Sequence, residues 1–388
     1  MTDDNKSFID CWSEKYTDVK VHRILSLDGG GILGIISLMI LKKLEDDLKI
    51  ATGQGDKFRL GDYFHLIGGT STGSIIAAGL SIGMTVDEII GFYKNSGSQM
   101  FQKHRFFRRF WSKHKSEPLA QLLRETFEIK PKHDRTLGAK DLKCLFGAVL
   151  QNSSTNSTWL VSNNPYSKYN ALNHPTCNLK VPLWQIVRAS TAAPTFFDPE
   201  EINLNTQKPD KPFYFVDGGV TPHNNPAFAL YRLATAPEYG LNWKTGEDKM
   251  LLISIGTSSF SLGETKNISK GRSLLRTAKN TPAEMIGVMA EDQDLNCRFV
   301  GKCVYGPQVN REVGTMMISP ATKAGRKFTY ARYNPNVDKE GLIDLGLPNY
   351  RTDDFKQMDD TTHLDKMQVV GKAYASKYFD ITPFGNLI

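Results

Sequence analysis

The feature that most constrains the fold is a three-part pattern that occurs twice near the start of the chain: a short apolar run, a glycine-rich loop and a helical segment. Residues 21–27 are rich in β-formers, the loop covers 28–34, and residues 35–50 have helical spacing. A second apolar run at 63–67 leads into a tight turn and a small-residue helix across 68–80. Strands that alternate with helices favour a parallel sheet with helices packed on it. The sequence therefore predicts an α/β fold with a mostly parallel central sheet flanked by helices.

Later segments extend this pattern. We expect helices at 85–95, 118–127, 181–193, 282–290 and 364–378, strands at 146–150, 213–216, 251–255 and 328–332, and a polar turn at 151–158. We expect an N-terminal segment at 1–20, a catalytic core at 21–260, and a C-terminal extension of the same domain at 261–388 that carries regulatory or lid elements.

Composition sets the broad class of protein. The chain has 388 residues, of which 40% are hydrophobic and 23% charged, so there is enough apolar mass for a large core. The net charge of +7 attracts anionic surfaces such as phospholipid headgroups, although it also serves plain solubility.

Five cysteines without a C-x-x-C pair, and a polar start at residues 1–5, indicate reduced thiols and a cytoplasmic location. Apolar stretches are too short to span a bilayer.

The first candidate for chemistry is a G-x-S-x-G motif formed by Gly69, Ser71 and Gly73. The two glycines leave room for a sharp strand-to-helix turn from which the serine hydroxyl projects. The helix that follows places N–H groups and a positive dipole end near that hydroxyl. The motif fits a serine nucleophile, while the alternative is a tight turn without chemistry.

A second candidate is the loop that begins at Asp28 and continues through Gly29, Gly30 and Gly31 to Gly34. Consecutive glycines leave several N–H groups unhindered, which suits an oxyanion hole for a tetrahedral acyl intermediate. The same loop spells G-x-G-x-x-G, the fingerprint of dinucleotide binding. That alternative requires an acid at the end of the next strand, where this chain has the G-x-S-x-G turn instead.

A third candidate is Asp217-Gly218-Gly219, which follows the apolar run at 213–216. An acid at the end of a buried strand, followed by two glycines, can reach a neighbouring turn, although Asp-Gly is also common in ordinary turns. We expect the following residues 223–226, His-Asn-Asn-Pro, to shape the loop by hydrogen bonds from side chains to the backbone.

This order of three motifs, each at a strand end, resembles the patatin-like phospholipase family. Residues 187–194, Val-Arg-Ala-Ser-Thr-Ala-Ala-Pro, look like the family's helix before the strand of the catalytic aspartate. Residues 252–257, Leu-Ile-Ser-Ile-Gly-Thr, look like its next core strand. The resemblance covers about residues 24–257. It implies a three-layer α/β fold and hydrolysis of acyl esters of membrane glycerophospholipids without a metal.

The resemblance assigns Ser71 as nucleophile and Asp217 as its only catalytic partner, a Ser-Asp dyad that works through an acyl-enzyme. It assigns the oxyanion N–H groups to Gly29, Gly30 and Gly31. The family commonly carries Arg or Lys at the position of Leu33, so the oxyanion must rely here on main-chain donors or on a cation from elsewhere. A carboxyl group facing a serine in a partly dry cleft would have a raised pKa and act as general base.

One histidine, His363, follows the aspartate in the chain order of a Ser-Asp-His triad. It lies beside Asp359 and Asp360. We interpret this segment as a solvated polar turn rather than as part of the active site.

A basic aromatic segment at 101–115 interrupts the α/β pattern. Arg105, Arg108, Arg109 and Trp111 stand there among further lysines and phenylalanines, with no acid between them. Such a segment suits an anionic membrane surface. It equally suits an anionic ligand gripped by arginine and stacked on an aromatic ring, or an ordinary helix with aromatics in the core.

A narrower resemblance is to bacterial antiphage effector phospholipases that a cyclic di- or trinucleotide activates. It implies that the protein acts at the inner face of the membrane, with peripheral membrane contact, no cofactor beyond that activator, no nucleic acid polymer as partner, and a homodimer as one arrangement. Two other functions stay open, a dinucleotide-binding module and a non-catalytic lipid- or nucleotide-binding scaffold.

Overall fold

The computed structural model describes residues 9–10, 12, 19–100, 118–194, 196–204, 211–259, 274–317 and 325–388. The strands within these residues are β1 (His22–Leu27), β2 (Leu66–Thr70), β3 (Leu145–Asn152), β4 (Ser157–Ser162), β5 (Glu200–Ile202), β6 (Phe213–Asp217), β7 (Met250–Ile255), β8 (Lys302–Tyr305) and β9 (Thr329–Tyr333). The α-helices are α2 (Gly34–Thr52), α3 (Leu60–Tyr63), α4 (Thr72–Ser81), α5 (Val86–Met100), α6 (Pro118–Phe127), α7 (Leu183–Ser190), α8 (Ala227–Thr235), α9 (Leu274–Val300), α10 (Lys339–Asp344) and α11 (Leu364–Tyr378).

All these strands belong to one sheet. Its order is β5-β6-β3-β2-β1-β7-β9-β8, and β4 also pairs with β3. Every pair from β3 to β8 along this order is parallel, whereas β4 and β6 pair antiparallel with β3 and β5 pairs antiparallel with β6. The prediction of a mostly parallel sheet is confirmed, and the sequence did not reveal the antiparallel extension next to β3.

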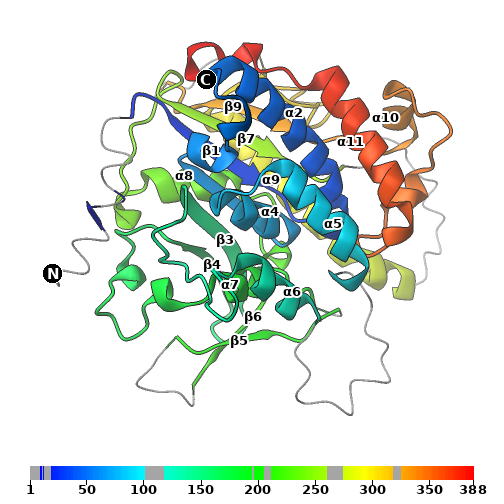
Figure 1. Cartoon of the computed structure of the whole chain (residues 1–388). Helices are drawn as coiled ribbons and strands as arrows, with labels where there is room; N and C mark the ends of the chain where they lie inside the picture. Colours follow the sequence, from blue (N-terminus) through cyan, green and yellow to red (C-terminus); the bar gives the residue numbers. More distant parts are fainter. Residues whose placement is uncertain are drawn as a thin grey trace.

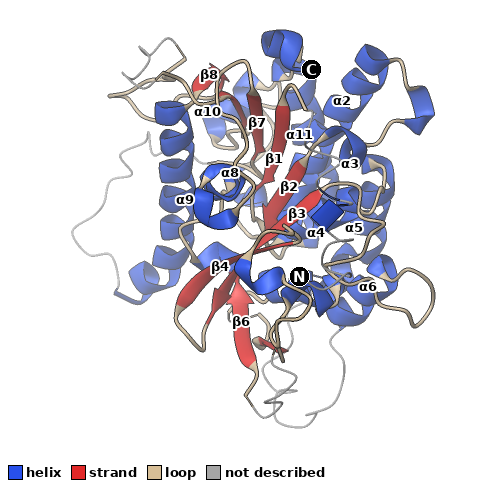
Figure 2. Ribbon diagram, turned by 90° about the vertical axis from the view of Figure 1, so that its left-hand side faces the viewer, coloured by secondary structure: helices blue, strands red, loops and turns tan. Residues whose placement is uncertain are grey.

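Helices cover both faces of the parallel strands, which gives the three layers that the sequence predicted. In Figure 2, α2, α4, α5 and α11 lie on one side of the sheet and α8 and α9 on the other. Helices α2 and α11 come from opposite ends of the chain and pack side by side (Figure 1). Their approach is close, because a Cβ atom on Gly371 would lie 2.7 Å from Cβ of Met39.

The core lies on both faces of β1 and β7, the two middle strands of the parallel part of the sheet. Every residue of β7 is buried, as is every residue of β1 except Arg23. Strands of a parallel sheet with helices on both sides lose their alternation of polar and apolar residues, because neither face meets water. The continuous apolar runs in the sequence are therefore the signature of this central position.

The second strand lies three residues later than predicted. Residues 63–67 were expected to form it, but Tyr63 ends α3, and β2 runs through Gly68 and Gly69 to Thr70. A Cβ on Gly68 would lie 2.4 Å from Leu230 in α8, and one on Gly69 would lie 2.1 Å from the backbone of Gly73. These glycines are needed for close packing inside the strand, not for a turn after it.

Other boundaries also differ. The polar run at 151–158 is not one turn, because β3 continues to Asn152 and β4 begins at Ser157. The Asn152 side chain accepts hydrogen bonds from the N–H groups of Ser154 and Thr155 and closes the hairpin. Helices α5 and α9 are longer than expected. A capping box opens α5, since the side chains of Thr85 and Glu88 each accept a hydrogen bond from the other's backbone N–H.

No helix in the described part of the chain combines the length and the apolar character that crossing a membrane requires.

Candidate active site

Ser71 stands between β2 and α4 in a strained backbone conformation. Its φ is 52° and its ψ is −124°, a combination that non-glycine residues rarely adopt. Hydrogen bonds hold it there: the Ser71 N–H donates to Oγ of Ser190 (3.0 Å), and that hydroxyl donates to the carbonyl of Val149 (2.8 Å). The Ser71 carbonyl accepts from the Ser74 N–H and hydroxyl. The serine side chain is thereby directed away from the strand.

Asp217 meets this serine directly. Oγ of Ser71 donates to Oδ2 of Asp217 at 2.6 Å, and Oδ1 accepts from the N–H of Gly219 at 2.7 Å. The strand register explains the meeting, since Leu150 of β3 pairs with Asp217 and its neighbour Val149 pairs with Thr70. Two residues that lie 146 positions apart in sequence thus share one hydrogen bond.

Burial governs the electrostatics of this carboxyl group. Only 5% of Asp217 is exposed, and burial raises its pKa to about 6. The hydrogen bonds from Ser71 and Gly219 and the positive charge of Arg188 act in the opposite direction but do not offset the lost hydration. A carboxylate with such a pKa is ionised at neutral pH, yet it is a stronger base than an ordinary aspartate.

The glycine loop lies beside Ser71 because β1 and β2 are adjacent and parallel, with Leu27 opposite Gly69. Its N–H groups are not equivalent. The Gly29 N–H donates to the carbonyl of Asn224 at 3.1 Å, so it has a fixed partner inside the protein. Among the described residues, no acceptor bonds the N–H of Gly30 or Gly31. The N–H groups of Gly30 and Gly31 are thus the freer donors of the three, and the oxyanion role of Gly29, Gly30 and Gly31 stays a prediction.

The remaining glycines of the motifs allow close approach of backbone segments. A Cβ on Gly73 would lie 2.2 Å from the carbonyl oxygen of Leu27, and one on Gly218 would lie 2.2 Å from that of Val149. A Cβ on Gly34 would lie 2.7 Å from Oγ1 of Thr72. These contacts press α4 against the end of β1 and bring the acid loop against β3.

A buried cation from β9 reaches the start of the glycine loop. Leu33 is buried, and Arg332 forms a two-bond ion pair with Asp28 (2.6 and 2.8 Å) and donates to Ser254. Asp28 raises the pKa of the Arg332 guanidinium above its ordinary value. The carboxylate of Asp28 neutralises this cation, so Asp28 acts as an anchor for Arg332 at the start of the loop.

The dinucleotide alternative conflicts with the space around the loop. The Ile32 N–H donates to the carbonyl of Met358 at 2.8 Å, and a Cβ on Gly31 would lie 2.2 Å from the same oxygen. A pyrophosphate bound by the fingerprint would need these N–H groups and this space at the start of the helix. A protein carbonyl already occupies that place.

His363 lies in the polar turn that the sequence predicted. Its Nε2 is 3.5 Å from Asp354 and 4.0 Å from Asp360, at the start of α11. The basic aromatic residues Arg105, Arg108, Arg109 and Trp111 lie outside the described residues, so the expectations for them stay predictions.

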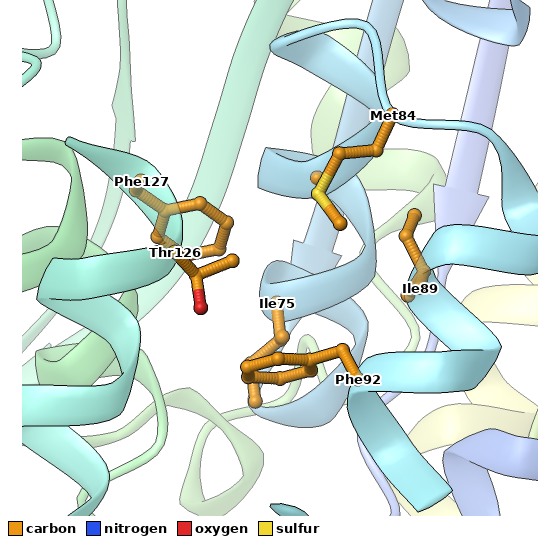
Figure 3. A pocket seen from close by; sticks show the side chains of 7 residues that line it. Ile75, Met84, Ile89, Phe92, Thr126 and Phe127 are labelled. Atoms are coloured by element: carbon orange, nitrogen blue, oxygen red, sulfur yellow. The ribbon is translucent and has the colours of Figure 1, made fainter. Parts of the chain in front are cut away.

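An apolar recess lies beside α4, the helix that follows Ser71. Side chains from α4, α5 and α6 converge on it (Figure 3). It is lined by Ile75, Gly79, Met84, Ile89, Phe92, Thr126 and Phe127. Ile75 lies one helical turn after Ser71, but the recess is too narrow for a water molecule. An acyl chain could enter here only if these helices moved apart.

The comparisons with known proteins match the region that contains these motifs. A family model described as patatin-like phospholipase matches residues 25–231, which is more than half of the chain and includes both Ser71 and Asp217. The chain belongs to the patatin-like phospholipase family. The sequence-based assignment to this family is thereby confirmed.

Individual patatin-like relatives match a similar region. The chain is 32% identical over 275 residues to patatin-16 of Solanum tuberosum, which covers 66% of this chain and 64% of that protein. It is 32% identical over 257 residues to patatin-17 of Solanum cardiophyllum, with 61% of each chain covered. The match thus spans slightly less than two thirds of these relatives.

Two solved structures resemble this patatin-like chain. Human GIVD cytosolic phospholipase A2 gives a TM-score of 0.42 at 10% identity and covers 97% of this chain and 62% of its own. VipD from Legionella pneumophila gives a TM-score of 0.41 at 12% identity and covers 92% and 66%.

Sequence reasoning missed the roles of two residues at this patatin-like site: Ser190 holds the backbone of Ser71, and Arg188 contributes charge near Asp217. Asn224 was expected to bond the backbone through its side chain, and it donates to the Gly29 carbonyl, a partner that the sequence did not indicate. The sequence did contain a sign of the α7 residues. Residues 187–194 resemble a helix of the family, but the sequence analysis gave none of them a role. No local pattern marked Arg332, which lies far beyond the matched region.

Proposed function

We propose that this protein is a serine lipid acyl hydrolase that cleaves acyl esters of membrane glycerophospholipids through a Ser71–Asp217 dyad and an acyl-enzyme. The observation that carries the proposal is the 2.6 Å hydrogen bond from Ser71 Oγ to a buried carboxyl group whose pKa is raised. Membership of the patatin-like phospholipase family supports the same reaction class. No metal takes part in the proposed reaction.

In the first step, Oγ of Ser71 attacks the acyl carbonyl while Asp217 takes the serine proton. The carbonyl oxygen becomes an oxyanion, which accepts hydrogen bonds from the N–H groups of Gly30 and Gly31. Thr72, the first residue of α4, offers a further N–H at the positive end of the helix dipole. The intermediate then expels the lipid alcohol, which receives the proton from Asp217, and the acyl group stays on Ser71.

In the second step, Asp217 takes a proton from a water molecule, which attacks the acyl-enzyme. A second oxyanion forms in the same place and collapses, and Ser71 regains its proton from Asp217 as the fatty acid leaves. One carboxyl group thus serves as base and acid in both halves of the reaction, without a histidine.

The first prediction concerns pH. Only the ionised form of Asp217 can accept the serine proton, so kcat/KM should rise with pH and level off, with a midpoint near pH 6, because burial raises the pKa of Asp217 to about 6. The measurement is hydrolysis of a soluble short-chain ester between about pH 4 and 8. A midpoint near ~4, the pKa of an ordinary aspartate, would contradict the role of burial.

The reaction itself is tested by release of free fatty acid from phosphatidylglycerol and phosphatidylethanolamine vesicles. We expect release by the wild-type protein, and covalent labelling of Ser71 by a fluorophosphonate that mimics the tetrahedral intermediate. A folded protein that releases no fatty acid and leaves Ser71 unlabelled would favour a non-catalytic scaffold.

We extend the proposal to location and control. The protein is proposed to work in the cytoplasm at the inner face of the membrane, to contact it peripherally through Arg105, Arg108, Arg109 and Trp111, and to act as a homodimer. We propose activation by a cyclic di- or trinucleotide in bacterial antiviral defence, which the resemblance to antiphage effector phospholipases supports. Adding these nucleotides to the vesicle assay tests the activation, and an unchanged rate of fatty acid release would contradict it.

A further inference from the structure

The carbonyl of Gly29 accepts two side-chain hydrogen bonds. Nδ2 of Asn224 donates to it at 3.3 Å and Oγ1 of Thr257 donates at 3.2 Å. Asn224 lies in the loop after the catalytic acid, and Thr257 lies two residues after the end of β7. Both side chains are buried, with 7% and 6% of each residue exposed. A third bond joins the same partners, from the Gly29 N–H to the Asn224 carbonyl.

These bonds determine which way the next N–H points. A trans peptide unit is planar, so the N–H of Gly30 points opposite to the carbonyl of Gly29. With that carbonyl held by Asn224 and Thr257, the Gly30 N–H faces away from both. Among the described residues it has no acceptor. Two donors on the carbonyl also polarise the peptide unit, which strengthens the N–H as a donor.

Packing keeps the peptide in this orientation. A Cβ on Gly29 would lie 2.3 Å from Oδ1 of Asn224, and a Cβ on Gly30 would lie 2.3 Å from Oγ1 of Thr257. The two side chains therefore fill the space that the glycines leave. Glycine backbones rotate with little steric penalty, so the loop needs such external contacts to keep one orientation.

Asn224 also connects this loop to the acid and the nucleophile. A Cβ on Gly219 would lie 3.1 Å from Oδ1 of Asn224 and 3.0 Å from Oδ1 of Asp217. A Cβ on Gly29 would lie 3.3 Å from Cβ of Ser71. The Asn224 side chain thus lies where the glycine loop, the acid loop and the nucleophile turn meet.

Building on the proposed function, we propose that Asn224 and Thr257 are positioning residues that hold the Gly29–Gly30 peptide with its N–H toward the oxyanion. They touch neither substrate nor reacting atoms. Without them the peptide can rotate, and the Gly29 carbonyl would then turn its negative end toward the oxyanion.

The test compares Thr257→Val, Thr257→Ser and Asn224→Ala with the wild-type protein. Valine keeps the shape of threonine but lacks the hydroxyl, so we expect kcat to fall about tenfold with KM unchanged, which is less than the ~100-fold loss typical of deleting an oxyanion donor. Asn224→Ala should lower kcat about 100-fold, because it frees both the carbonyl and the space beside it. Thr257→Ser keeps a hydroxyl donor and should restore most of the wild-type rate.

The matched control is Thr329→Val. Thr329 is a buried threonine whose hydroxyl donates to the carbonyl of Glu247 at 2.7 Å, a contact outside the site. The Thr329→Val protein should lose about as much thermal stability as the Thr257→Val protein, but its kcat should equal that of the wild-type protein. Reaction of Ser71 with a fluorophosphonate should slow in parallel with kcat, because the phosphoryl oxygen occupies the same place as the oxyanion.

Wild-type rates in Thr257→Val and Asn224→Ala would overturn the positioning role. So would a Thr257→Ser protein as slow as the valine variant, since that result would point to space filling alone. If the wild-type protein neither hydrolysed esters nor reacted with the phosphonate, the proposed function would fail and the positioning role with it. The wild-type measurement therefore separates the two failures.

Discussion

Replacing Asp217 by asparagine should abolish hydrolysis and yet make the folded protein more stable at neutral pH. Asparagine keeps the shape of the side chain but cannot accept the serine proton, so we expect kcat to fall about 10⁴-fold, the upper range for loss of a general base. Ser71→Ala should lower kcat by a similar factor. The kcat of the double variant should be no lower than that of either single variant, because the two groups act as a unit.

The gain in stability follows from the raised pKa. The pKa of Asp217 is about 6 in the folded protein, against 3.8 for an ordinary aspartate. Between these values the folded state binds more protons than the unfolded state, so the free energy of unfolding decreases as the pH rises from about 4 to 6. Above pH 6 the whole penalty of burying the charge is present, about 3 kcal/mol for a shift of roughly two units. Asparagine removes that penalty.

Urea unfolding and vesicle hydrolysis measure the two effects. The stability gain of Asp217→Asn should be largest at pH 7 and should disappear well below pH 3.8, where the wild-type carboxyl group is protonated in both states. Asp62→Asn is the control, because Asp62 is exposed and its replacement should leave both properties unchanged. Equal stability of Asp217→Asn and wild type at pH 7 would contradict the raised pKa.

His363 provides the test of the dyad against a triad. It faces Asp354 and Asp360 in a polar turn, so His363→Ala should keep full hydrolysis. Loss of activity in a folded His363→Ala protein would show that a histidine takes part.

Local signals were sufficient to predict the strand-loop-helix units and the three motifs. A glycine loop after an apolar run can be recognised from neighbouring residues alone. The sequence therefore predicted that Ser71 and Asp217 lie at strand ends. The same signals misplaced the end of β2, because a glycine that packs against Leu230 looks in sequence like a glycine that makes a turn. Only the packed structure separates these two uses.

Contacts across the sheet could not be predicted in this way. Asn224 meets Gly29 from 195 residues away, and Arg332 meets Asp28 from 304 residues away. Such pairs depend on strand order, which puts β9 next to β7 and β7 next to β1. For the same reason no local pattern indicated that the Gly29 N–H already has a partner, the carbonyl of Asn224.

Breaking the buried ion pair between Asp28 and Arg332 should cost far more stability than breaking a charge pair at the surface. Both side chains are buried, with 5% and 3% exposed, and two hydrogen bonds join them. Arg332→Met leaves an uncompensated carboxylate in the core, so we expect a loss of about 3–5 kcal/mol in the free energy of unfolding. Asp28→Asn should cause a loss of similar size, because it leaves a buried guanidinium without its counter-charge.

The double variant decides whether the pair or the individual side chains matter. Asp28→Asn combined with Arg332→Met removes both charges, so it should lose clearly less stability than the sum of the two single variants. Lys377→Met is the matched control, since Lys377 pairs with Asp344 at the surface, where water screens the charges and such a pair adds little stability. Urea unfolding followed by tryptophan fluorescence measures all four proteins.

The outcome also bears on the C-terminal third of the chain. Arg332 lies on β9, which follows residue 260, whereas Asp28 begins the glycine loop of the proposed site. One outcome is that each single variant loses several kcal/mol in the free energy of unfolding and that the double variant regains much of this loss. In that case the C-terminal residues stabilise the loop that presents Gly30 and Gly31. If all three variants stay within about 1 kcal/mol of wild type, the pair contributes as little as a surface pair, and the loop is held by its other contacts, among them those of Asn224, Thr257 and Met358.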